Sequence, residues 1–344
     1  MPGQVILQAD HLSKSFDLAA GLFSKGGKVV YAVNDISLTV RRGEAYGLVG
    51  ESGCGKTTTA RLLIGLYKAD EGKVLYSGVL PALKKDKKEL QNQVSAEKEP
   101  EKAVEPRDIT LFTKNELKAY RERIKYIFQD PARSLNPRMN VFGVLTSGLR
   151  YSSRWTNKED ARALAAAIIE EVGLTATDIE RRPSEFSGGQ RQRISIARGL
   201  IMEPDMLICD EVVSALDVSI QGQILNLLQD IRAKRGLSYL FIAHDLKVSC
   251  WFCDRIGVMY RGMLVEEAPA SDLYKSGLHP YTKLLFDGAQ GIHTENAGEV
   301  KTTLSHETGC PFAHRCQKAD EKCRTSCPAF TEVSSGHKVR CFKI

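Results

Sequence analysis

The segment from Gly50 to Thr57 constrains the fold of this chain more than any other feature of its sequence. Two glycines stand five positions apart, and Lys56 and Thr57 follow directly, between an expected buried strand and an expected helix. Glycines let the backbone wrap around a phosphate, while the lysine adds a cation and the threonine hydroxyl a ligand for Mg²⁺. The spacing therefore predicts a nucleotide-binding loop. The residues expected to bind the nucleotide here are Gly50, Ser52, Gly53, Cys54, Gly55, Lys56, Thr57 and Thr58.

Composition excludes several classes of protein. The 344 residues include 48 Lys and Arg and 42 Asp and Glu, and the net charge of +6 is spread along the chain. This mild excess does not favour nucleic acid as a partner. No apolar run has the length of a membrane-spanning helix, and the segment from Met1 to Gln4 lacks the basic and apolar regions of a secretion signal. We therefore expect a cytoplasmic protein that reaches a membrane by docking onto other subunits.

Apolar strands alternate with helices, which predicts an α/β fold whose parallel sheet is covered on both faces. Residues 114–199 are expected to be mostly helical. Residues 81–108 are rich in charge and contain no aromatic residue, which predicts a solvated, mobile insertion. The clearest expected elements are Val5–Leu7, Ile36–Val40, Ala45–Val49, Thr57–Leu66, Lys158–Val172, Met206–Cys209, Ile220–Arg232 and Tyr239–Ala243.

An apolar strand that ends in two acids, Asp210 and Glu211, is the second chemical signal. Beside a bound nucleotide, Asp210 would hold Mg²⁺ and Glu211 would polarise the attacking water. Such a pair by itself is more often an exposed strand end. The interpretation therefore depends on the phosphate loop found earlier in the chain.

The segment from Phe186 to Gln190 closely resembles the signature motif of ABC ATPases. Other motifs of that family stand in the expected order: Gln129 resembles the Q-loop glutamine, Ser214–Asp217 the D-loop, and His244 the switch histidine. The resemblance implies that ATP and Mg²⁺ lie between the phosphate loop of one subunit and the signature motif of another.

Roles for individual residues follow from the same resemblance. It implies that Glu211, His244 and Gln129 are catalytic, and that Thr57, Gln129 and Asp210 bind Mg²⁺. Further nucleotide contacts are expected from Gln129, Asp210, Ser187, Gly188, Gly189, Gln190 and Asp217.

The resemblance also implies an architecture. It predicts a RecA-like phosphate-loop NTPase core with a parallel sheet, an antiparallel β subdomain, a helical ABC subdomain and a small Cys-rich C-terminal extension. We expect the ATPase domain over residues 1–290, with the helical subdomain at about 114–199 and the charged insertion at about 81–108. The extension is expected over residues 291–344.

Ser134–Met139 and His279–Thr282 resemble the oligopeptide/dipeptide importer branch, and the two glycine motifs resemble its F-type ATPase more than its D-type ATPase. This implies an ATP hydrolase that powers peptide uptake at the cytoplasmic face of the inner membrane. The implied partners are a D-type ATPase as heterodimer partner, two transmembrane permease subunits and, indirectly, an extracytoplasmic solute-binding protein. Nickel and oligosaccharide importers of the same branch are alternatives, and a soluble ABC ATPase acting in DNA repair or translation is a more distant one.

Five of the nine cysteines lie between residues 310 and 341. In a reducing cytosol, such a local group suggests a metal site before disulfides. Cys310, Cys316, Cys323 and Cys341 resemble the C-terminal motif of the importer branch, which is associated with a four-iron, four-sulfur cluster, and Cys327 is not part of that motif. A zinc site or unligated thiols are the alternatives, although gaps of five, six and seventeen residues are mostly wider than the spacing usual in zinc sites.

Two further details concern the nucleotide site. Phe16 best matches the family position of the aromatic residue that stacks on adenine, and Tyr31 is the alternative. Where the family usually has Pro-Thr after the catalytic glutamate, this chain has Val212 and Val213, so the turn that leads to the D-loop differs.

Overall fold

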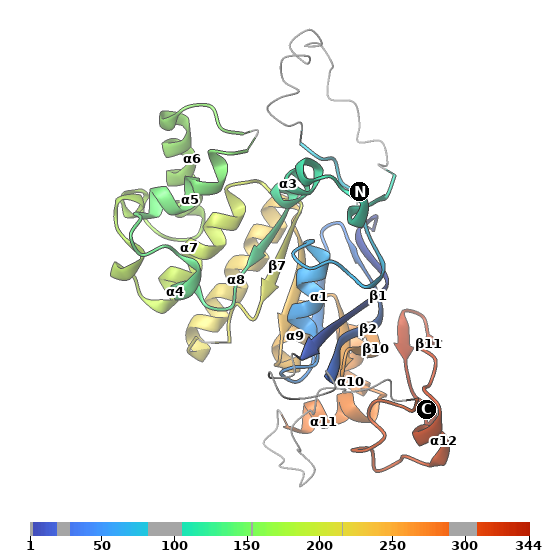
Figure 1. Ribbon diagram of the computed structural model, residues 1–344. Helices are drawn as coiled ribbons and strands as arrows, with labels where there is room; N and C mark the ends of the chain where they lie inside the picture. Colours follow the sequence, from blue (N-terminus) through green and yellow to red (C-terminus); the bar gives the residue numbers. More distant parts are fainter. Residues whose placement is uncertain (1–2, 19–27, 82–104, 153, 215, 289–307) are drawn as a thin grey trace, which may run out of the picture.

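The computed structural model describes residues 3–18, 28–81, 105–152, 154–214, 216–288 and 308–344. Most of the charged insertion predicted at 81–108 therefore lies outside the described residues. Two sheets occupy the centre of the molecule, and the helices α4 to α7 form a group on one side of them, at the left of Figure 1. Within the described ranges, no helix combines the length and the hydropathy needed to cross a bilayer.

The smaller sheet has four antiparallel strands in the order β2-β1-β4-β5. Its last strand falls at the end of the predicted insertion, so that end is ordered by pairing with β4. The strands are β1 (Val5–Leu18), β2 (Lys28–Arg41), β4 (Glu71–Tyr76) and β5 (Arg107–Asp108).

The larger sheet has eight strands in the order β11-β12-β10-β9-β3-β8-β7-β6. The run from β9 to β6 is parallel, whereas β10, β12 and β11 pair antiparallel. These strands are β3 (Ala45–Val49), β6 (Ile124–Ile127), β7 (Met206–Asp210), β8 (Ser238–Ala243), β9 (Arg255–Tyr260), β10 (Met263–Pro269), β11 (Thr331–Ser334) and β12 (His337–Val339).

The three helices predicted most clearly are present and differ from the prediction by a few residues at their ends. The region 114–199 is mostly helical as predicted, but it also contains the strand β6. The helices are α1 (Lys56–Leu63), α3 (Lys114–Arg123), α4 (Pro131–Ser134), α5 (Val141–Leu149), α6 (Lys158–Glu171), α7 (Gly188–Leu200), α8 (Val218–Arg235), α9 (Leu246–Phe252), α10 (Ala270–Ser276), α11 (Pro280–Gly288) and α12 (Glu321–Thr325), with short 3₁₀ helices at Ile109–Leu111, Ala176–Glu180 and Pro183–Glu185.

The central strands β3, β7 and β8 of the large sheet are buried on both faces, as their near-continuous apolar sequences predict. In β3, Ala45 and Val49 join a core shared with the helical group, while Tyr46 and Leu48 join a second core shared with the small sheet. Side chains alternate between the two faces of a strand, so a strand packed on both faces must be apolar at every position. This arrangement places the carboxyl ends of β3, β7 and β8 at one edge of the sheet.

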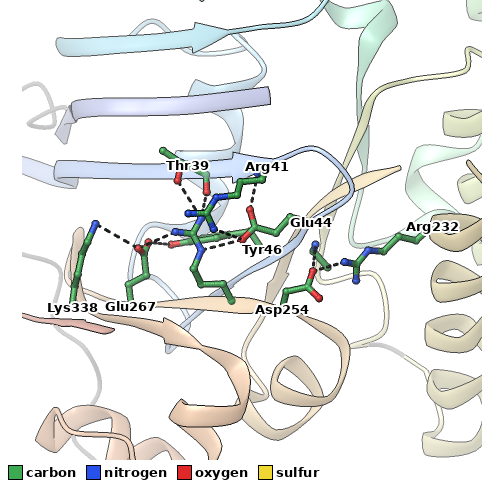
Figure 2. Close-up of polar contacts among 10 residues, drawn as sticks. Thr39, Arg41, Glu44, Tyr46, Arg232, Asp254, Glu267 and Lys338 are labelled. Carbon is green, nitrogen blue, oxygen red and sulfur yellow. Dashed lines mark hydrogen bonds and ion pairs between the residues drawn. The ribbon is translucent and has the colours of Figure 1, made fainter. Parts of the chain in front are cut away.

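A buried network of charged residues joins the two sheets (Figure 2). Arg255 donates to Glu44 Oε1 at 3.0 Å, to Glu267 Oε1 at 3.3 Å and to the Thr39 carbonyl at 2.6 Å, and thus links β9 to β10 and β2. Tyr46 also donates its hydroxyl to Glu267, at 2.7 Å. Burial, with the nearby Glu267 charge, holds the pKa of Tyr46 well above its usual value. Because the acids and the arginine are buried together, each is compensated by a partner of opposite charge.

The C-terminal extension, defined here as residues 308–344, is built onto the large sheet. Its strand β12 pairs with β10, where Glu266 lies opposite Val339 and Glu267 opposite Lys338. The buried Glu266 accepts from the His337 side chain, with 2.7 Å between Oε1 and Nε2. Figure 1 shows the extension beside β10 and α10, with α12 and β11 near the C-terminus.

Candidate nucleotide-binding site

The predicted phosphate loop connects the end of β3 to the start of α1. Lys56 is buried within it, with only 4% of the residue exposed. Its Nζ donates to the carbonyl of Gly50 at 2.7 Å and to that of Glu51 at 3.0 Å. The ammonium group is therefore held inside the loop by the loop's own backbone, where it stands as a fixed cation for an anionic ligand.

The backbone of the small sheet and a β-turn support the loop from outside. Gly55 has φ +111, and a Cβ added there would lie 2.1 Å from the Ala32 carbonyl oxygen of β2. Gly262, between β9 and β10, donates its N–H to the Cys54 carbonyl at 2.8 Å. Only glycine fits at position 55, because both the positive φ and the close approach of β2 exclude a side chain. The course of the loop therefore depends on strands far from it in sequence.

Asp210, at the end of β7, is next to the start of α1. Its Oδ1 accepts from the Thr57 hydroxyl at 3.2 Å, and its Oδ2 accepts from the Tyr126 hydroxyl. Burial and the neighbouring Asp210 charge raise the pKa of Tyr126, so this phenol remains a donor. A hydroxyl and a carboxylate side by side are hard oxygen ligands of the kind that Mg²⁺ prefers.

Glu211 and Gln129 are in direct contact. Gln129 Nε2 donates to Glu211 Oε2 at 2.7 Å, across 82 positions of sequence. Glu211 has φ +48, an uncommon conformation for a residue other than glycine, and its N–H donates to the Ile242 carbonyl of β8 at 3.0 Å. Strained backbone of this kind persists where the surrounding structure demands it and is often found at functional sites. His244 follows β8 directly and is exposed at the same edge of the sheet.

The two valines that replace the usual Pro-Thr are buried at 2% and 6% exposure and belong to the core shared with the helical group. A hydrogen bond across the turn stabilises it: the Ser214 hydroxyl donates to the Glu211 carbonyl at 2.9 Å. Val212 and Val213 thus anchor the turn by apolar packing. The contact between Gln129 and Glu211 is present with these valines in place.

The predicted signature residues begin α7. Ser187 is the N-cap: its hydroxyl accepts from the Gln190 N–H at 3.3 Å, and the Gln190 side chain accepts from the Ser187 N–H at 2.9 Å. This capping box satisfies two backbone donors that would otherwise lack partners. A Cβ at Gly189 would lie 2.7 Å from Ile220 in the first turn of α8, whose N-cap residue is Asp217, and a Cβ at Gly188 would lie 3.8 Å from Leu216. The signature and D-loop segments are therefore neighbours, while Ala215 lies outside the described residues.

The two aromatic candidates lie on opposite faces of the β1–β2 ribbon. Ser15 pairs directly with Tyr31, and Phe16 pairs with Val30. Directly paired residues share a face and successive residues alternate, so Phe16 and Tyr31 point in opposite directions. The Phe16 ring packs edge-on against Tyr67, with 5.5 Å between centroids. The assignment of Phe16 as the adenine-stacking residue stays a prediction.

The cysteines predicted to hold an iron–sulfur cluster do not form a recognisable metal site among the described residues. Among the described residues, which include all five cysteines of the extension, no three His, Cys, Asp or Glu side chains converge closely enough to hold a metal ion. The thiols nevertheless lie in one small unit. Cys310 donates its N–H to the Cys323 carbonyl at 2.8 Å, and burial together with the nearby Cys327, Cys341 and Cys323 raises the pKa of Cys310 to about 11.

Three residues that contact the loop or its acids were not predicted from the sequence as residues of the site. Tyr126 holds Asp210, Tyr281 accepts from the Glu51 N–H at 2.9 Å, and Arg315 forms an ion pair with the Glu51 carboxylate. The sequence contained a signal for Tyr126, because a tyrosine directly before the last residue of a short, partly buried strand needs a polar partner. No sequence signal indicated the contact of Arg315, since its partner Glu51 is 264 positions away.

A glycine-rich loop between a buried strand and a helix, two acids at the end of a neighbouring parallel strand, and a capped glycine pair on a helical group together define an ATP-binding cassette. The sequence profile of ABC transporters matches residues 33–214. A second profile, described as "Oligopeptide/dipeptide transporter, C-terminal region", matches residues 265–323. The chain belongs to the ABC transporter family and is an ATPase of that family.

Named relatives match along nearly the whole chain. The oligopeptide transport ATP-binding protein OppF of Bacillus subtilis (strain 168) is 43% identical over 336 residues, covering 98% of this chain and 96% of the relative. OppF of Haemophilus influenzae is 38% identical over 353 residues, covering 99% and 98%. A solved dimeric ATP-binding cassette in a post-hydrolysis state, bound to ADP and phosphate, superposes with a TM-score of 0.61 over 77% of this chain and 99% of its own, at 23% identity. At that identity the likeness concerns the fold alone.

Proposed function

We propose that this chain binds ATP and Mg²⁺ and hydrolyses ATP to drive the import of oligopeptides or dipeptides through partner permease subunits. The contacts of Thr57 with Asp210 and of Gln129 with Glu211 are the observation that carries the proposal, because they join the loop, both acids and the Q-loop residue in one site. Peptide as the cargo is supported by the names of the relatives and by the C-terminal profile, which favour it over nickel or oligosaccharide.

The roles of the site residues follow from their positions. Lys56 and the loop N–H groups bind the phosphates, and Thr57, Asp210 and Gln129 hold Mg²⁺. The ion supplies charge neutralisation for the transferred phosphoryl group. Glu211 orients and polarises the attacking water, and its bond from Gln129 keeps the carboxylate aimed at the phosphate side of the sheet. Phe16 stacks on adenine, and His244, at the edge next to Glu211, contacts the terminal phosphate.

The signature residues Ser187 to Gln190 act on the nucleotide of a second ATPase subunit. In this proposal the second subunit is a D-type ATPase, so that two different chains sandwich ATP. A solved cassette with this fold is dimeric, which supports a paired arrangement. Two transmembrane permease subunits complete the importer, a solute-binding protein delivers the peptide, and this chain lies at the cytoplasmic face of the inner membrane as a peripheral subunit.

Substitution of Lys56 by alanine tests the central claim. Lys56→Ala removes the cation and leaves the glycines and the helix N-terminus, so we expect binding of a fluorescent ATP analogue and peptide uptake to be lost. Lys68→Ala, at an exposed lysine beyond α1, is the matched control and should bind like wild type. Wild-type affinity in Lys56→Ala would reject the assignment of the loop as the phosphate site.

We also propose that Cys310, Cys316, Cys323 and Cys341 are the ligands of a four-iron, four-sulfur cluster. Four thiolates are the usual ligands of such a cluster, and the backbone bond between Cys310 and Cys323 brings two of the candidates into one unit. Anaerobically purified protein should contain about four iron and four sulfide per chain. Cys327→Ser should leave the iron content unchanged, whereas Cys341→Ser should reduce it. Stoichiometric zinc without iron would replace the cluster by a structural zinc site.

A further inference from the structure

Glu51, the second residue of the loop, is held through all of its polar groups. Its carboxylate accepts two hydrogen bonds from the Arg315 guanidinium, from Nη1 to Oε2 at 2.8 Å and from Nη2 to Oε1 at 3.1 Å. Its N–H donates to the Tyr281 hydroxyl oxygen at 2.9 Å, and its carbonyl accepts from Lys56 Nζ at 3.0 Å. One residue thus connects the C-terminal extension to the lysine of the loop.

Arg315 is held in a packed aromatic environment. Its side chain is 7% exposed, and its guanidinium lies 5.9 Å from the centroid of the Tyr260 ring and 5.8 Å from that of Phe312. Tyr281 packs on both rings, with centroids 4.6 Å from Tyr260 and 5.5 Å from Phe312. A planar guanidinium with two parallel bonds to a carboxylate is pre-organised, and a partly buried pair is screened less than an exposed one.

The position of Arg315 is set by the cysteine-containing turn that precedes it. Arg315 donates its N–H to the Phe312 carbonyl at 3.0 Å, and Ala313 donates to the Cys310 carbonyl at 3.0 Å. Cys310 in turn donates to the Cys323 carbonyl at 2.8 Å. The turn from Cys310 to Cys316 therefore presents the arginine to the phosphate loop.

We propose that Arg315 is a positioning residue of the nucleotide site: it clamps Glu51, and through the Glu51 carbonyl it orients Lys56, so that the turn from Cys310 to Cys316 sets the affinity for nucleotide. The inference rests on the proposed role of Lys56 in binding ATP. It adds a contact between the extension and the phosphate loop that the sequence motifs do not contain.

The two partners of the ion pair have unequal effects when removed. Arg315→Gln leaves the Glu51 carboxylate uncompensated beside a loop that binds anionic phosphates, so repulsion adds to the loss of positioning. Glu51→Gln leaves the Arg315 cation, which does not repel phosphate. This variant therefore loses only the positioning of the loop. We expect the dissociation constant to rise about tenfold for Arg315→Gln and by a smaller factor for Glu51→Gln. Because the residues are coupled, the double variant should resemble Glu51→Gln more than the product of the two effects.

The experiment measures the dissociation constant of a fluorescent ATP analogue with Mg²⁺ on the full-length chain, together with KM and kcat for ATP. Arg315→Lys keeps the charge but loses the two parallel bonds, so its affinity should fall between wild type and Arg315→Gln. Arg324→Gln, at an exposed arginine of the same extension, is the matched control. The midpoint of unfolding is measured for each variant, to detect any variant that does not fold. If Arg315→Gln does not fold, the affinity of Arg315→Lys tests the inference.

Several results of these binding measurements would overturn the inference. These are a wild-type dissociation constant in Arg315→Gln and Arg315→Lys, independent effects of the two substitutions in the double variant, and an equal loss of affinity in Arg324→Gln. A fall in kcat without a change in affinity would also reject it. Lys56→Ala separates this inference from the proposed function: loss of binding there with wild-type binding in the Arg315 variants rejects only the positioning role.

Discussion

Substitution of Glu211 by glutamine isolates the chemistry of the site. The change is isosteric, and among the described residues the Glu211 side chain has one hydrogen bond to preserve, the 2.7 Å bond from Gln129. The backbone of Glu211 at φ +48 imposes the same strain on either side chain, so we expect stability to change by less than about 0.5 kcal/mol. The carboxylate that polarises water is lost, while the contacts of Lys56 and Thr57 are untouched.

The expected magnitude follows from the role assigned to that carboxylate. Proton transfer by a positioned side chain contributes about 10²- to 10⁴-fold to a rate, or roughly 3–5 kcal/mol of activation free energy. Glu211→Gln should therefore reduce kcat for ATP by two to four orders of magnitude (about 10²- to 10⁴-fold) while the dissociation constant of ATP stays near that of wild type. The assay is phosphate release by the assembled ATPase pair, with nucleotide binding measured in parallel. We also expect ATP and Mg²⁺ to trap a closed dimer.

Glu203→Gln is the matched control for this experiment. Glu203 also has a positive φ, of +47, but it is exposed and pairs with Arg154 away from the site. It should hydrolyse ATP at the wild-type rate. Turnover in Glu211→Gln equal to that of wild type would refute the assignment of Glu211, and would show that the turn through Val212 and Val213 places a different group beside the water.

Two further predictions concern the phosphate loop and the buried histidine that precedes α11. Gly55→Ala adds a Cβ 2.1 Å from the Ala32 oxygen, so it should cost about 1–3 kcal/mol more in unfolding free energy than Gly53→Ala, which shares the positive φ but meets nothing within 4 Å. Burial lowers the pKa of His279 from 6.5 to about 4, so the unfolded chain binds the proton more readily. The free energy of unfolding should therefore fall by up to about 3 kcal/mol as the pH drops from about 6.5 to about 4. In denaturation measured as a function of pH, His279→Asn should lack this part of the fall. The same dependence of the unfolding free energy on pH in wild type and His279→Asn would contradict the prediction.

The sequence by itself determined the parts of the site whose geometry is local. A buried strand, a loop with glycines five apart and a following helix are continuous in the chain, so the spacing predicted the phosphate loop and α1 directly. The capping box between Ser187 and Gln190 is equally local, because a helix N-terminus needs partners within three residues. The order of the motifs was sufficient to predict the family and the fold class.

Packing decided which distant residues meet. The bond between Gln129 and Glu211 and the contact of Tyr126 with Asp210 exist because β6 lies beside β7 in the parallel sheet. Alternation of side chains predicts which face a residue takes but not which strand becomes its neighbour. The close approach of β2 to Gly55 arises in the same way, from the packing of one sheet on another.

The C-terminal extension shows this division most clearly. The sequence contains its cysteines in a spacing that suggested a metal site, but among the described residues no three metal-ligating side chains converge closely enough to hold a metal ion. The same fold pairs β12 with β10 and places Arg315 against Glu51, although the two residues are 264 positions apart. Local spacing fixes only what a few consecutive residues can reach, whereas contacts over such separations depend on strand order and register, which many side chains set together.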